Sequence, residues 1–379
     1  MIDILKSIKI KINKIIKNDK FIQLIENKLY SLSNKVKYRR WNKVVYKHWK
    51  ERLTILCRTL GNKKLSKGQK EELRRFWGKF VNINTYDHEF YLNACDDFDV
   101  KYIPASIHYT VIDKYFNDWE IAKIVDNKTE YKRLFPNVLQ PETILMRCNG
   151  FWYHDSVISN TDVCDIILYN VPCFIKLATN SEGGKGVYYI DKECTKQEIN
   201  SLLNKIKGDI IIQKALEQSL ELSKLNSSSV NTIRLMTLLN KNGSVKLCSA
   251  CLRMGIEGSK VDNASSGGVV AGINDKGYLK KYAYKPTGER FVKHPTSNII
   301  FENYKIPNFD KCKDLVIKLA PHYPYFRLIS WDIALNQNND PVLIEANLSS
   351  GELDFHQLNN GPIFGEDTER ILKEIFKNE

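Results

Sequence analysis

The sequence predicts an α+β fold in which antiparallel hairpins follow a helical N-terminal region. From about residue 126 onward, short runs rich in β-branched and aromatic residues alternate with turns that contain glycine. Helical stretches are expected between these runs at residues 195–206 and 309–322, and residues 21–80 are expected to be helical. At 379 residues the chain is long enough for at least two domains and a sizeable core.

Composition excludes several classes of protein. With 43% hydrophobic and 27% charged residues, the chain has the balance of a globular protein, which argues against intrinsic disorder. No apolar run has the length that a bilayer-spanning helix needs, and lysines interrupt the apolar residues near the N-terminus. The nine cysteines are scattered, as in proteins of a reducing compartment. We therefore expect a cytoplasmic protein.

The positive charge is concentrated at the N-terminus. Of the net charge of +13, residues 1–50 contribute +11, with 14 Lys and Arg against 3 Asp and Glu. The rest of the chain carries only +2. A nucleic-acid-binding protein more often has a basic stripe on its main body. The net charge is the only feature that favours nucleic-acid binding, so we expect no nucleic-acid partner.

Residues 1–20 have the pattern of an amphipathic helix, with one aliphatic side and lysines around the rest. Such a helix suits the surface of an anionic membrane, which predicts peripheral contact at the inner face of the cell membrane. The alternative is that the aliphatic side packs on the protein's own body and that the lysines are solvated. The aliphatic residues are Ile4, Leu5, Ile8, Ile12, Ile15 and Ile16.

The segments ISWDIAL, NQNNDP and VLIEANLSSG predict a hairpin that carries a metal site. Glu345 and Asn347 are two residues apart in one strand, so their side chains share a face, and Asp332 on the facing strand can join them. Two carboxylates and an amide oxygen form an incomplete set of ligands that suits Mg²⁺, with phosphate oxygens and water completing it. The alternative is a hairpin with polar residues facing solvent. Its apolar neighbours argue against this, because buried carboxylates without partners are costly.

The stretch KLATNSEGGKGVYYI, residues 176–190, places a glycine-rich cationic loop between two β-rich runs. Glycines allow backbone N–H groups to approach phosphate closely. The loop is therefore either an ordinary turn or a lid that closes over phosphates. Lys176, at its start, is either a lysine that extends to solvent at a strand end or a nucleotide ligand.

The order of these motifs resembles that of the ATP-grasp ligases. A strand lysine and glycine loop are followed by IIQKAL, by arginines within strands and by the D…E-x-N hairpin, over about residues 120–365. The segments NTIRLMTL, VDNASSGGVVAGI and LDFHQLNNGPIFG are similar to the sugar-transfer-associated branch, which is linked to bacterial capsule, O-antigen and other surface-polysaccharide synthesis. The resemblance implies the ATP-grasp fold, in which two α+β subdomains clasp ATP. The expected parts are a basic helical segment at residues 1–50, a helical or mixed region at 51–125, a lid subdomain at 126–212 and a core subdomain with the metal site at 213–379.

The resemblance also implies which residues bind ATP. Lys128 takes the place of the family's first nucleotide lysine, although Asn127 stands where aspartate is usual. Gln213 begins the hinge whose backbone contacts adenine, where glutamate is more common. Glu217 and Glu221 are both candidates for the ribose contact. The implied ATP-binding residues are Lys128, Lys176, Ser181, Gly183, Gly184, Lys185, Gly186, Gln213, Lys214 and Leu216.

Further residues are implied to act on the substrates. Arg234 and Arg253, on adjacent strands, would be catalytic and would meet the γ-phosphate and the acylphosphate. An arginine inside an apolar strand needs a partner, so a structural salt bridge is the alternative. The residues implied to bind substrate are Asp262, Asn263, Gly267 and Gly268 for the carboxylate, and His356 and Gln357 for the acceptor.

The implied activity is ADP-forming carboxylate–amine ligation. ATP would phosphorylate a small or sugar-linked carboxylate, and an amine would displace phosphate from the acylphosphate to form an amide. Two Mg²⁺ ions, or Mn²⁺ in their place, would be held by Asp332, Glu345 and Asn347. A kinase of the same fold, which phosphorylates a hydroxyl, and a scaffold without catalysis are the alternatives, and the identities of the carboxylate and the amine stay open.

Overall fold

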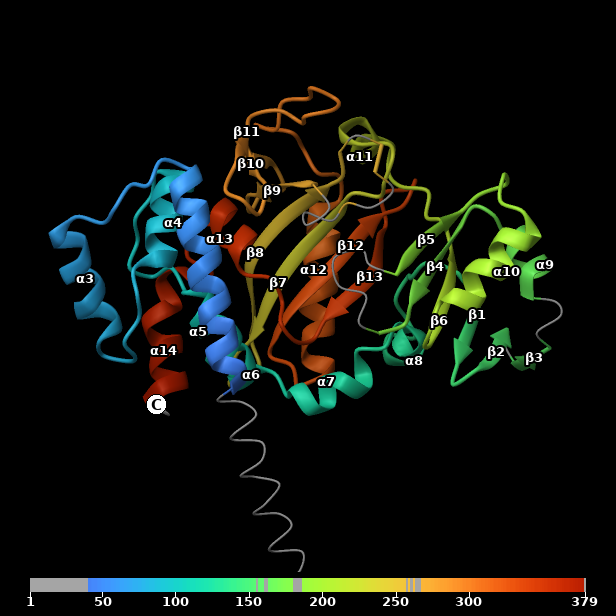
Figure 1. Ribbon diagram of the computed structural model, residues 1–379, viewed down its shortest axis with the longest axis horizontal. Helices are drawn as coiled ribbons and strands as arrows, with labels where there is room; N and C mark the ends of the chain where they lie inside the picture. The colour runs from blue at the N-terminus through green and yellow to red at the C-terminus, as the bar shows by residue number, and fades with distance from the viewer. Residues whose placement is uncertain are drawn as a thin grey trace, which may run out of the picture. The chain divides into compact units, whose positions relative to one another are not determined.

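The chain divides into two compact units, Met1–Arg52 and Leu53–Glu379. In the first unit, residues 40–52 are helical, and the predicted amphipathic helix at residues 1–20 lies outside the residues that the structure describes. Both β-sheets belong to the second unit (Figure 1). The computed structural model describes residues 40–154, 156–159, 163–179, 186–256, 258–259, 262 and 267–377.

Helices occupy the second unit up to residue 134. Residues 53–59 are helical, and Ser66 begins the next helix with a capping box that it forms with Gln69. One short element is a π-helical turn, a rare conformation that is frequent at functional sites. The elements are α3 (Lys67–Trp77), α4 (Tyr86–Cys95), α5 (Ala105–Ile107), the π-helical η1 (His108–Ile112), α6 (Asp113–Phe116), α7 (Trp119–Val125), the 3₁₀-helical η2 (Lys128–Glu130) and α8 (Tyr131–Leu134).

The first sheet has six antiparallel strands in the order β3-β2-β1-β6-β4-β5. Strand structure thus begins at residue 143 and not near 126, because residues 128–134 form η2 and α8. The expected boundary between residues 212 and 213 falls inside a strand of this sheet. The strands are β1 (Thr143–Cys148), β2 (Phe151–His154), β3 (Ser156–Ile158), β4 (Cys173–Leu177), β5 (Val187–Ile190) and β6 (Ile210–Lys214).

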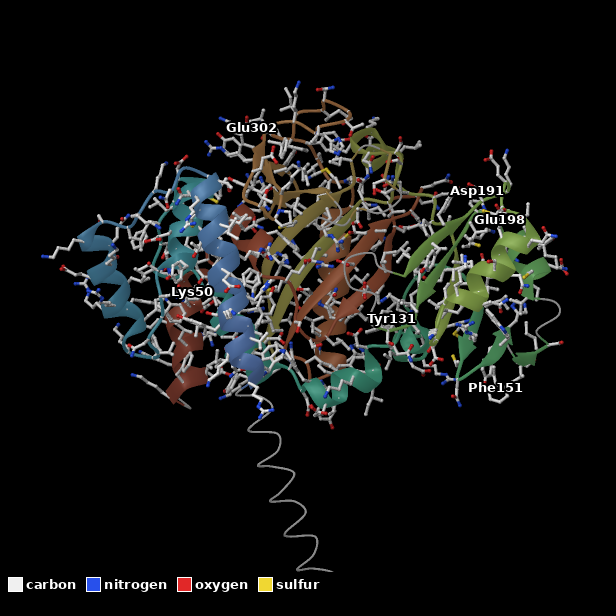
Figure 2. The ribbon with its side chains drawn as sticks, viewed as in Figure 1. Lys50, Tyr131, Phe151, Asp191, Glu198 and Glu302 are labelled. Carbon is white, nitrogen blue, oxygen red and sulfur yellow. The ribbon has the colours of Figure 1, made fainter. Side chains whose placement is uncertain are left out.

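Two helices, α9 (Val163–Tyr169) and α10 (Lys196–Lys205), cover one face of the first sheet. Thr195 and Glu198 form a capping box at the start of α10, which matches the helix expected at residues 195–206. Figure 2 labels Glu198 in this helix. Ile175 and Ile212 point into this core, so the residues that alternate with them point away from the helices. That second face carries Lys176 and Gln213.

The second sheet has seven antiparallel strands in the order β11-β10-β9-β8-β7-β12-β13. Its central strands are almost completely buried, which explains their continuous apolar runs. The strands are β7 (Thr232–Leu239), β8 (Val245–Met254), β9 (Val269–Ile273), β10 (Leu279–Tyr284), β11 (Arg290–Phe291), β12 (Leu328–Leu335) and β13 (Pro341–Asn347).

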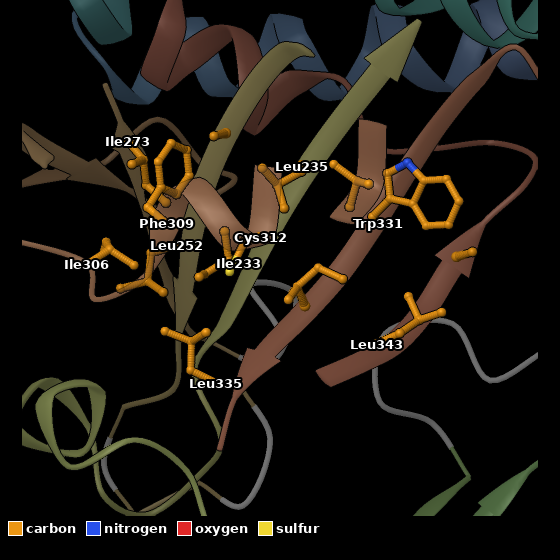
Figure 3. Packing of buried hydrophobic residues seen from close by; sticks show 14 of the residues in the cluster. Ile233, Leu235, Leu252, Ile273, Ile306, Phe309, Cys312, Trp331, Leu335 and Leu343 are labelled. Carbon is orange, nitrogen blue, oxygen red and sulfur yellow. The ribbon is translucent and has the colours of Figure 1, made fainter. Parts of the chain in front are cut away.

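One face of the second sheet packs against α12 (Phe309–Leu319), which continues into η5 (Ala320–His322) and so matches the helix expected at residues 309–322. Figure 3 shows this core, where Ile233 and Leu235 of β7 and Leu252 of β8 lie near Phe309 and Cys312. The largest hydrophobic cluster is therefore on this side.

The other face of the second sheet is apolar toward one end of its strands and polar toward the other. Met236 and Leu238 of β7 lie under a second cluster, built from α3, η1, α6 and the C-terminal helix. Thr232 and Arg234, at the other end of the strand, lie beyond that cluster and form part of a buried polar region. The remaining elements of the chain are α11 (Leu220–Leu225), α13 (Asp354–Asn360), η6 (Gly365–Asp367) and α14 (Thr368–Lys377).

The predicted fold class is confirmed, because helices and two antiparallel sheets alternate within one unit behind a helical N-terminal region. Among the described residues, no helix combines the length and the apolarity that crossing a bilayer requires.

Candidate active site

A row of polar side chains crosses the second sheet on the face that α12 leaves free. Arg234 of β7 lies opposite Asp332 of β12, which lies opposite Glu345 of β13. Arg253 of β8 lies opposite Thr232, two residues from Arg234 and therefore on the same face. The predicted hairpin geometry is confirmed, since Asp332 and Glu345 are cross-strand partners.

Asp332 is the centre of this row. Its carboxylate accepts two hydrogen bonds of 2.6 Å from Nε and Nη2 of Arg234, and one of 3.1 Å from Nη1 of Arg253. All three side chains are 6% exposed. Burial alone would raise the pKa of the Asp332 carboxyl, but the two guanidinium groups outweigh burial and hold the pKa below its usual value. Asp332 is therefore a buried carboxylate that stays ionised.

Each arginine has a second acidic partner. Nη1 of Arg234 donates to Oε2 of Glu352 at 2.7 Å. Nη2 of Arg253 lies 3.6 Å from Oδ1 of Asp262, whose other oxygen accepts a hydrogen bond from the hydroxyl of Thr232. The salt bridges that we gave as the alternative thus exist. Nε of Arg253 is nevertheless buried without a hydrogen-bond partner among the described residues, which leaves a donor for an anion.

Lys128 connects the first sheet to the second. Its backbone N–H donates to the carbonyl of Ala178 at the end of β4, and its Nζ donates to Oε1 of Glu345 at 2.7 Å. The turn that carries Lys128 is capped by Asn127, whose Oδ1 accepts hydrogen bonds from the N–H and the hydroxyl of Thr129. Asparagine therefore serves here as a cap in the place where the family usually has aspartate.

Lys176 lies on the face of the first sheet that α9 and α10 leave free. Its Nζ donates to Oε1 of Gln213 at 3.0 Å. Burial, and secondly the charge of Lys128, lowers the pKa of Lys176 to about 8, against the attraction of Glu345 and Asp262. Lys176 is thus within electrostatic reach of the acidic groups on the second sheet, and an anion bound beside it would raise its pKa again.

The charges of this site compensate one another. Four cations and four carboxylates take part, and each carboxylate lies in an ion pair with a lysine or an arginine. Such pairs are stable when buried only while both partners are present. The cations are Lys128, Lys176, Arg234 and Arg253, and the carboxylates are Asp262, Asp332, Glu345 and Glu352.

The oxygen ligands of the predicted metal site share one face of the hairpin. Asn347 lies opposite Ser330, and its amide nitrogen donates to the carbonyl of Ser330 at 3.1 Å, which leaves the amide oxygen as the end that suits a cation. In the part of the chain that the structure describes, no three His, Cys, Asp or Glu side chains form a group able to hold a metal. Asp332, Glu345 and Asn347 are therefore an incomplete oxygen set, which fits Mg²⁺ that is bound together with phosphate.

Tyr131 fixes the strand that carries these ligands. Its hydroxyl donates to the carbonyl of Ala346 at 3.0 Å and accepts from the N–H of the same residue at 3.3 Å. Ala346 is the residue between Glu345 and Asn347. Tyr131, labelled in Figure 2, begins α8 three residues after Lys128, so one short segment contacts both the backbone of Ala346 and the side chain of Glu345.

The end of β6 and the residues after it, where the hinge is predicted, border a cavity of about 290 Å³. Lys214, Leu216 and Glu217 line this cavity, together with the segment before β1 and the turn between β12 and β13. Glu221 lies on α11, where it pairs with Lys224 at 2.8 Å. Of the two predicted ribose contacts, Glu217 is the one at the cavity.

The structure describes the glycine loops in part. Gly186, at the end of the predicted lid, has a φ of +71°, and a Cβ there would lie 2.4 Å from Cδ1 of Leu177, so a residue with a side chain would be strained here. Gly267 also has a positive φ, of +98°, and Gly268 is buried beside it. The predicted site residues that lie outside the described part of the chain are Ser181, Gly183, Gly184, Lys185 and Asn263.

The two predicted acceptor residues are buried in α13. Gln357 is 0% exposed, and its amide group accepts from the N–H of Ile103, donates to the Ile103 carbonyl and donates to the Tyr91 hydroxyl. This corrects the prediction for Gln357, because its hydrogen-bonding groups hold the segment before α5. His356 is also 0% exposed, and burial lowers its pKa to about 3, so its imidazole is neutral. Its Nδ1 bonds to the hydroxyl of Ser249 at 2.8 Å.

Three residues of the site were not predicted from the sequence. Thr232 is two residues before Arg234 in NTIRLMTL, so strand periodicity is a signal that points to it. Glu352 follows the hairpin of the predicted metal site by five residues, but nothing in the sequence shows that its loop folds back toward Arg234. Tyr131 contacts a residue 215 positions away, and such a contact leaves no local pattern.

Comparison with known families places the chain among ATP-grasp proteins. The family described as sugar-transfer associated ATP-grasp matches residues 109–373, which is well over half of the chain. The chain belongs to this family, and the resemblance inferred from its motifs is confirmed. ATP-dependent ligation of the general ATP-grasp kind is the class of activity that this membership indicates. No curated protein matches the chain.

Solved structures show a distant likeness. The biotin carboxylase domain of 2-oxoglutarate carboxylase from Hydrogenobacter thermophilus is 13% identical with a TM-score of 0.39, and covers 69% of this chain and 47% of its own. N5-carboxyaminoimidazole ribonucleotide synthetase from Thermotoga maritima is 10% identical with a TM-score of 0.36, and the match covers 69% of this chain and 52% of the synthetase. The ATP-grasp ligase PsnB with its minimal precursor is 12% identical with a TM-score of 0.40, and the match covers 82% of this chain and 76% of PsnB. The chain thus spans about half the length of the first two, and the family assignment depends on the sequence match.

Proposed function

We propose that the chain is an ATP-dependent carboxylate–amine ligase that forms an amide through an acylphosphate. The observation that carries this proposal is the compensated cluster in which Arg234 and Arg253 neutralise Asp332 while Lys128 neutralises Glu345. A site of this composition suits a ligand that carries its own positive and negative charges, such as ATP with a divalent cation.

The ion pairs support an exchange of partners on ligand binding. Phosphates would take the lysines and arginines, and Asp332, Glu345 and Asn347 would hold Mg²⁺ through their oxygens. Bound Mg²⁺ would neutralise negative charge on the phosphates. Asp332 and Glu345 would then face positive charge in both states, from arginine or lysine without ligand and from Mg²⁺ with it, as buried carboxylates require.

Each part of ATP has candidate contacts in the chain. The hinge residues at the 290 Å³ cavity suit the base, with Glu217 near the ribose. Lys128 and Lys176 suit the α- and β-phosphates, because they lie where the two sheets meet. Arg234 and Arg253 suit the γ-phosphate, and the buried Nε of Arg253 is a donor that a phosphate oxygen would satisfy.

The chemistry then needs positioning and charge stabilisation, and no nucleophilic side chain. A carboxylate oxygen of the substrate attacks the γ-phosphorus, and the bond to the β-phosphate oxygen breaks to release ADP. The amine nitrogen next attacks the acyl carbon, phosphate leaves with the bridging oxygen, and the nitrogen loses a proton. The arginines would stabilise the acylphosphate and the departing phosphate.

The family's association with sugar transfer supports a sugar-linked substrate in surface-polysaccharide synthesis. A uronic acid joined to an amino acid, or an amino sugar joined to an acid, would satisfy the proposed chemistry. The basic segment of residues 1–50 would suit work beside an anionic membrane surface, where such polymers are assembled.

A screen for ADP release tests the proposal. The purified protein is incubated with ATP and Mg²⁺, hydroxylamine as a general nucleophile, and a panel of free and nucleotide-linked uronic acids and amino acids. At least one carboxylate should give ADP and a hydroxamate in equal amounts. Glu345→Gln should lower this rate about 100-fold or more, because a bound ion would lose a carboxylate ligand.

Glu366→Gln is the matched control, since Glu366 also pairs with a lysine but is 94% exposed. It should keep the wild-type rate. A stable phosphoester on a hydroxyl substrate, with no hydroxamate, would instead support the kinase. Absence of ADP release with every member of the panel would overturn the proposal of a ligase.

A further inference from the structure

Glu352 differs from the other three carboxylates of the site in its exposure. Its side chain is 44% exposed, compared with 6% for Asp332, 15% for Asp262 and 28% for Glu345. One of its oxygens accepts a hydrogen bond from Nη1 of Arg234. Glu352 is thus the acidic group of the cluster that a second substrate reaches most easily.

The loop that carries Glu352 is held in place from η1 and α6. The N–H of Ser350 donates to Oδ2 of Asp113 at 2.9 Å, and the carbonyl of Gly351 bonds to Nε2 of His108 at 3.0 Å. Both Asp113 and His108 are 1% exposed, so these contacts are shielded from water. A π-helical turn and a helix more than 200 residues earlier in the chain therefore fix the backbone on the N-terminal side of Glu352.

The backbone of this loop is also strained. Ser350 has a φ of +53°, a left-handed conformation that costs about 1 kcal/mol or more for a residue with a side chain. A Cβ on Gly351 would lie 2.7 Å from Oγ of Ser330, so the loop passes directly over β12. Strain of this kind persists where the surrounding structure enforces it, and it gathers at functional sites.

The charges of the site create a problem for an amine substrate that Glu352 would solve. At neutral pH an aliphatic amine is an ammonium ion, and it must approach an acylphosphate that is surrounded by two lysines and two arginines. Asp332 and Glu345 would be engaged with metal, and Asp262 is held by Thr232 and Arg253. Of the four carboxylates that the structure describes in this site, Glu352 is the one left to offset the repulsion.

We propose that Glu352 is a catalytic residue on the acceptor side, whose carboxylate binds the ammonium group of the amine and takes one of its protons. The neutral amine then attacks the acyl carbon, and phosphate leaves. The nitrogen must lose one more proton to form the amide, and this proton goes to the departing phosphate. The proposal rests on the ligase function, and it defines the acceptor as an amine that is protonated in solution. His108 and Asp113 are positioning residues, because they act through the loop.

Glu352→Gln separates this role from the others. Glutamine keeps the shape and an oxygen that can accept from Arg234, but it has no charge and takes no proton. Two rates are measured with the best carboxylate from the screen: amide formation with an amino acid or amino sugar, and hydroxamate formation with hydroxylamine, which is largely uncharged at neutral pH. We expect kcat/KM for the amine to fall about 100-fold, while hydroxamate formation falls less than about threefold.

The outcomes distinguish this inference from the proposed ligase function. Equal losses of both rates would give Glu352 a structural role through Arg234, and wild-type rates of both would show that it has no part in the reaction; either result overturns the inference and leaves the ligase standing. If the wild-type protein forms no hydroxamate with any carboxylate, the ligase function itself fails. Glu366→Gln, with both rates unchanged, is the control.

Discussion

Asp332 and Asp87 are two aspartates with nearly the same burial and opposite electrostatics. Counted over the whole residue, Asp332 in β12 is 4% exposed and Asp87 in α4 is 3% exposed. The pKa of Asp332 lies below its usual value because two arginines outweigh its burial. Burial, with a smaller contribution from the charge of Asp354, raises the pKa of Asp87 to about 7 despite a hydrogen bond of 2.7 Å from the N–H of Ala105.

The comparison shows that the partners of a buried carboxylate, and not its burial, decide whether it is charged. Asp332 is kept ionised at a place where a cationic ligand is proposed to bind. Within the described part of the chain, Asp87 has no cationic partner of this kind, so near neutral pH its charge is removed mainly by the binding of a proton. The same residue type therefore serves as a charged group in one region and as a largely structural hydrogen-bond acceptor in the other.

Removing a partner of Asp332 should leave it, like Asp87, as a buried carboxylate whose charge is poorly compensated. Arg234→Met takes away two hydrogen bonds and one positive charge, which leaves a buried carboxylate with Arg253 alone. We expect a loss of about 3 to 5 kcal/mol in the free energy of unfolding, measured by urea denaturation at pH 7.

The double variant Arg234→Met with Asp332→Asn sharpens this test. It removes the charge that the single variant leaves uncompensated, so it should be more stable than Arg234→Met alone. Arg370→Met is the control, since Arg370 is half exposed and pairs at the surface with Asp367. A loss of less than about 1 kcal/mol for Arg234→Met would contradict the view that the arginine compensates a buried charge.

Asp87 offers the opposite experiment. Its folded pKa of about 7 is higher than the value of 3.8 for an unperturbed aspartate, so the folded state binds more protons between these values. Stability that is present at pH 4 is therefore lost as pH rises toward 7. Asp87→Asn cannot ionise, and its side chain still offers an oxygen to the Ala105 N–H. Relative to wild type, it should gain about 2 kcal/mol or more on going from pH 5 to pH 8.

Urea denaturation at the two pH values measures this gain. Asp275→Asn, at an exposed turn residue, is the control and should show no comparable change. If Asp87→Asn and wild type keep the same difference in stability at pH 5 and pH 8, Asp87 is ionised in the folded protein at both, and the contrast with Asp332 disappears.

Lys176 extends the comparison to a cation. Burial lowers its pKa to about 8, so an increasing fraction is neutral above that pH. Because bound phosphate would favour the charged form, the affinity for a non-hydrolysable ATP analogue with Mg²⁺ should fall up to about tenfold per pH unit above pH 8. Lys176→Arg stays protonated in this range and should flatten the profile. Calorimetric titration from pH 7 to 9.5 measures both, and a wild-type affinity that does not change over this range would refute the pKa assignment.

Much of the fold and part of the site could be predicted because their signals are local. The alternation in VLIEANLSSG places Glu345 and Asn347 on one face, and the turn that precedes it brings Asp332 opposite Glu345. The helices α10 and α12 follow from apolar periodicity, and the capping box of Thr195 adds a start signal for α10.

The rest of the site could not be predicted because it depends on contacts between distant segments. Glu352 pairs with a residue 118 positions earlier, and its loop is held by residues 237 and 243 positions away. Gln357 was predicted to bind the acceptor because it follows the hairpin closely in the sequence, but α13 is buried along almost its whole length. Sequence periodicity shows which residues share a face, and it does not show what covers that face.

The hydroxyl of Tyr131 has a consequence for the second sheet as a whole. β13 is the last strand in the sheet, and an edge strand presents backbone groups that can pair with another chain. At Ala346 both of these groups are occupied by the one hydroxyl, and nearby the N–H of Leu343 is used by the carbonyl of Leu139. The strand that carries Glu345 and Asn347 can thus stay at the margin of the sheet, within reach of a ligand, while its outer edge is closed to the addition of a further strand.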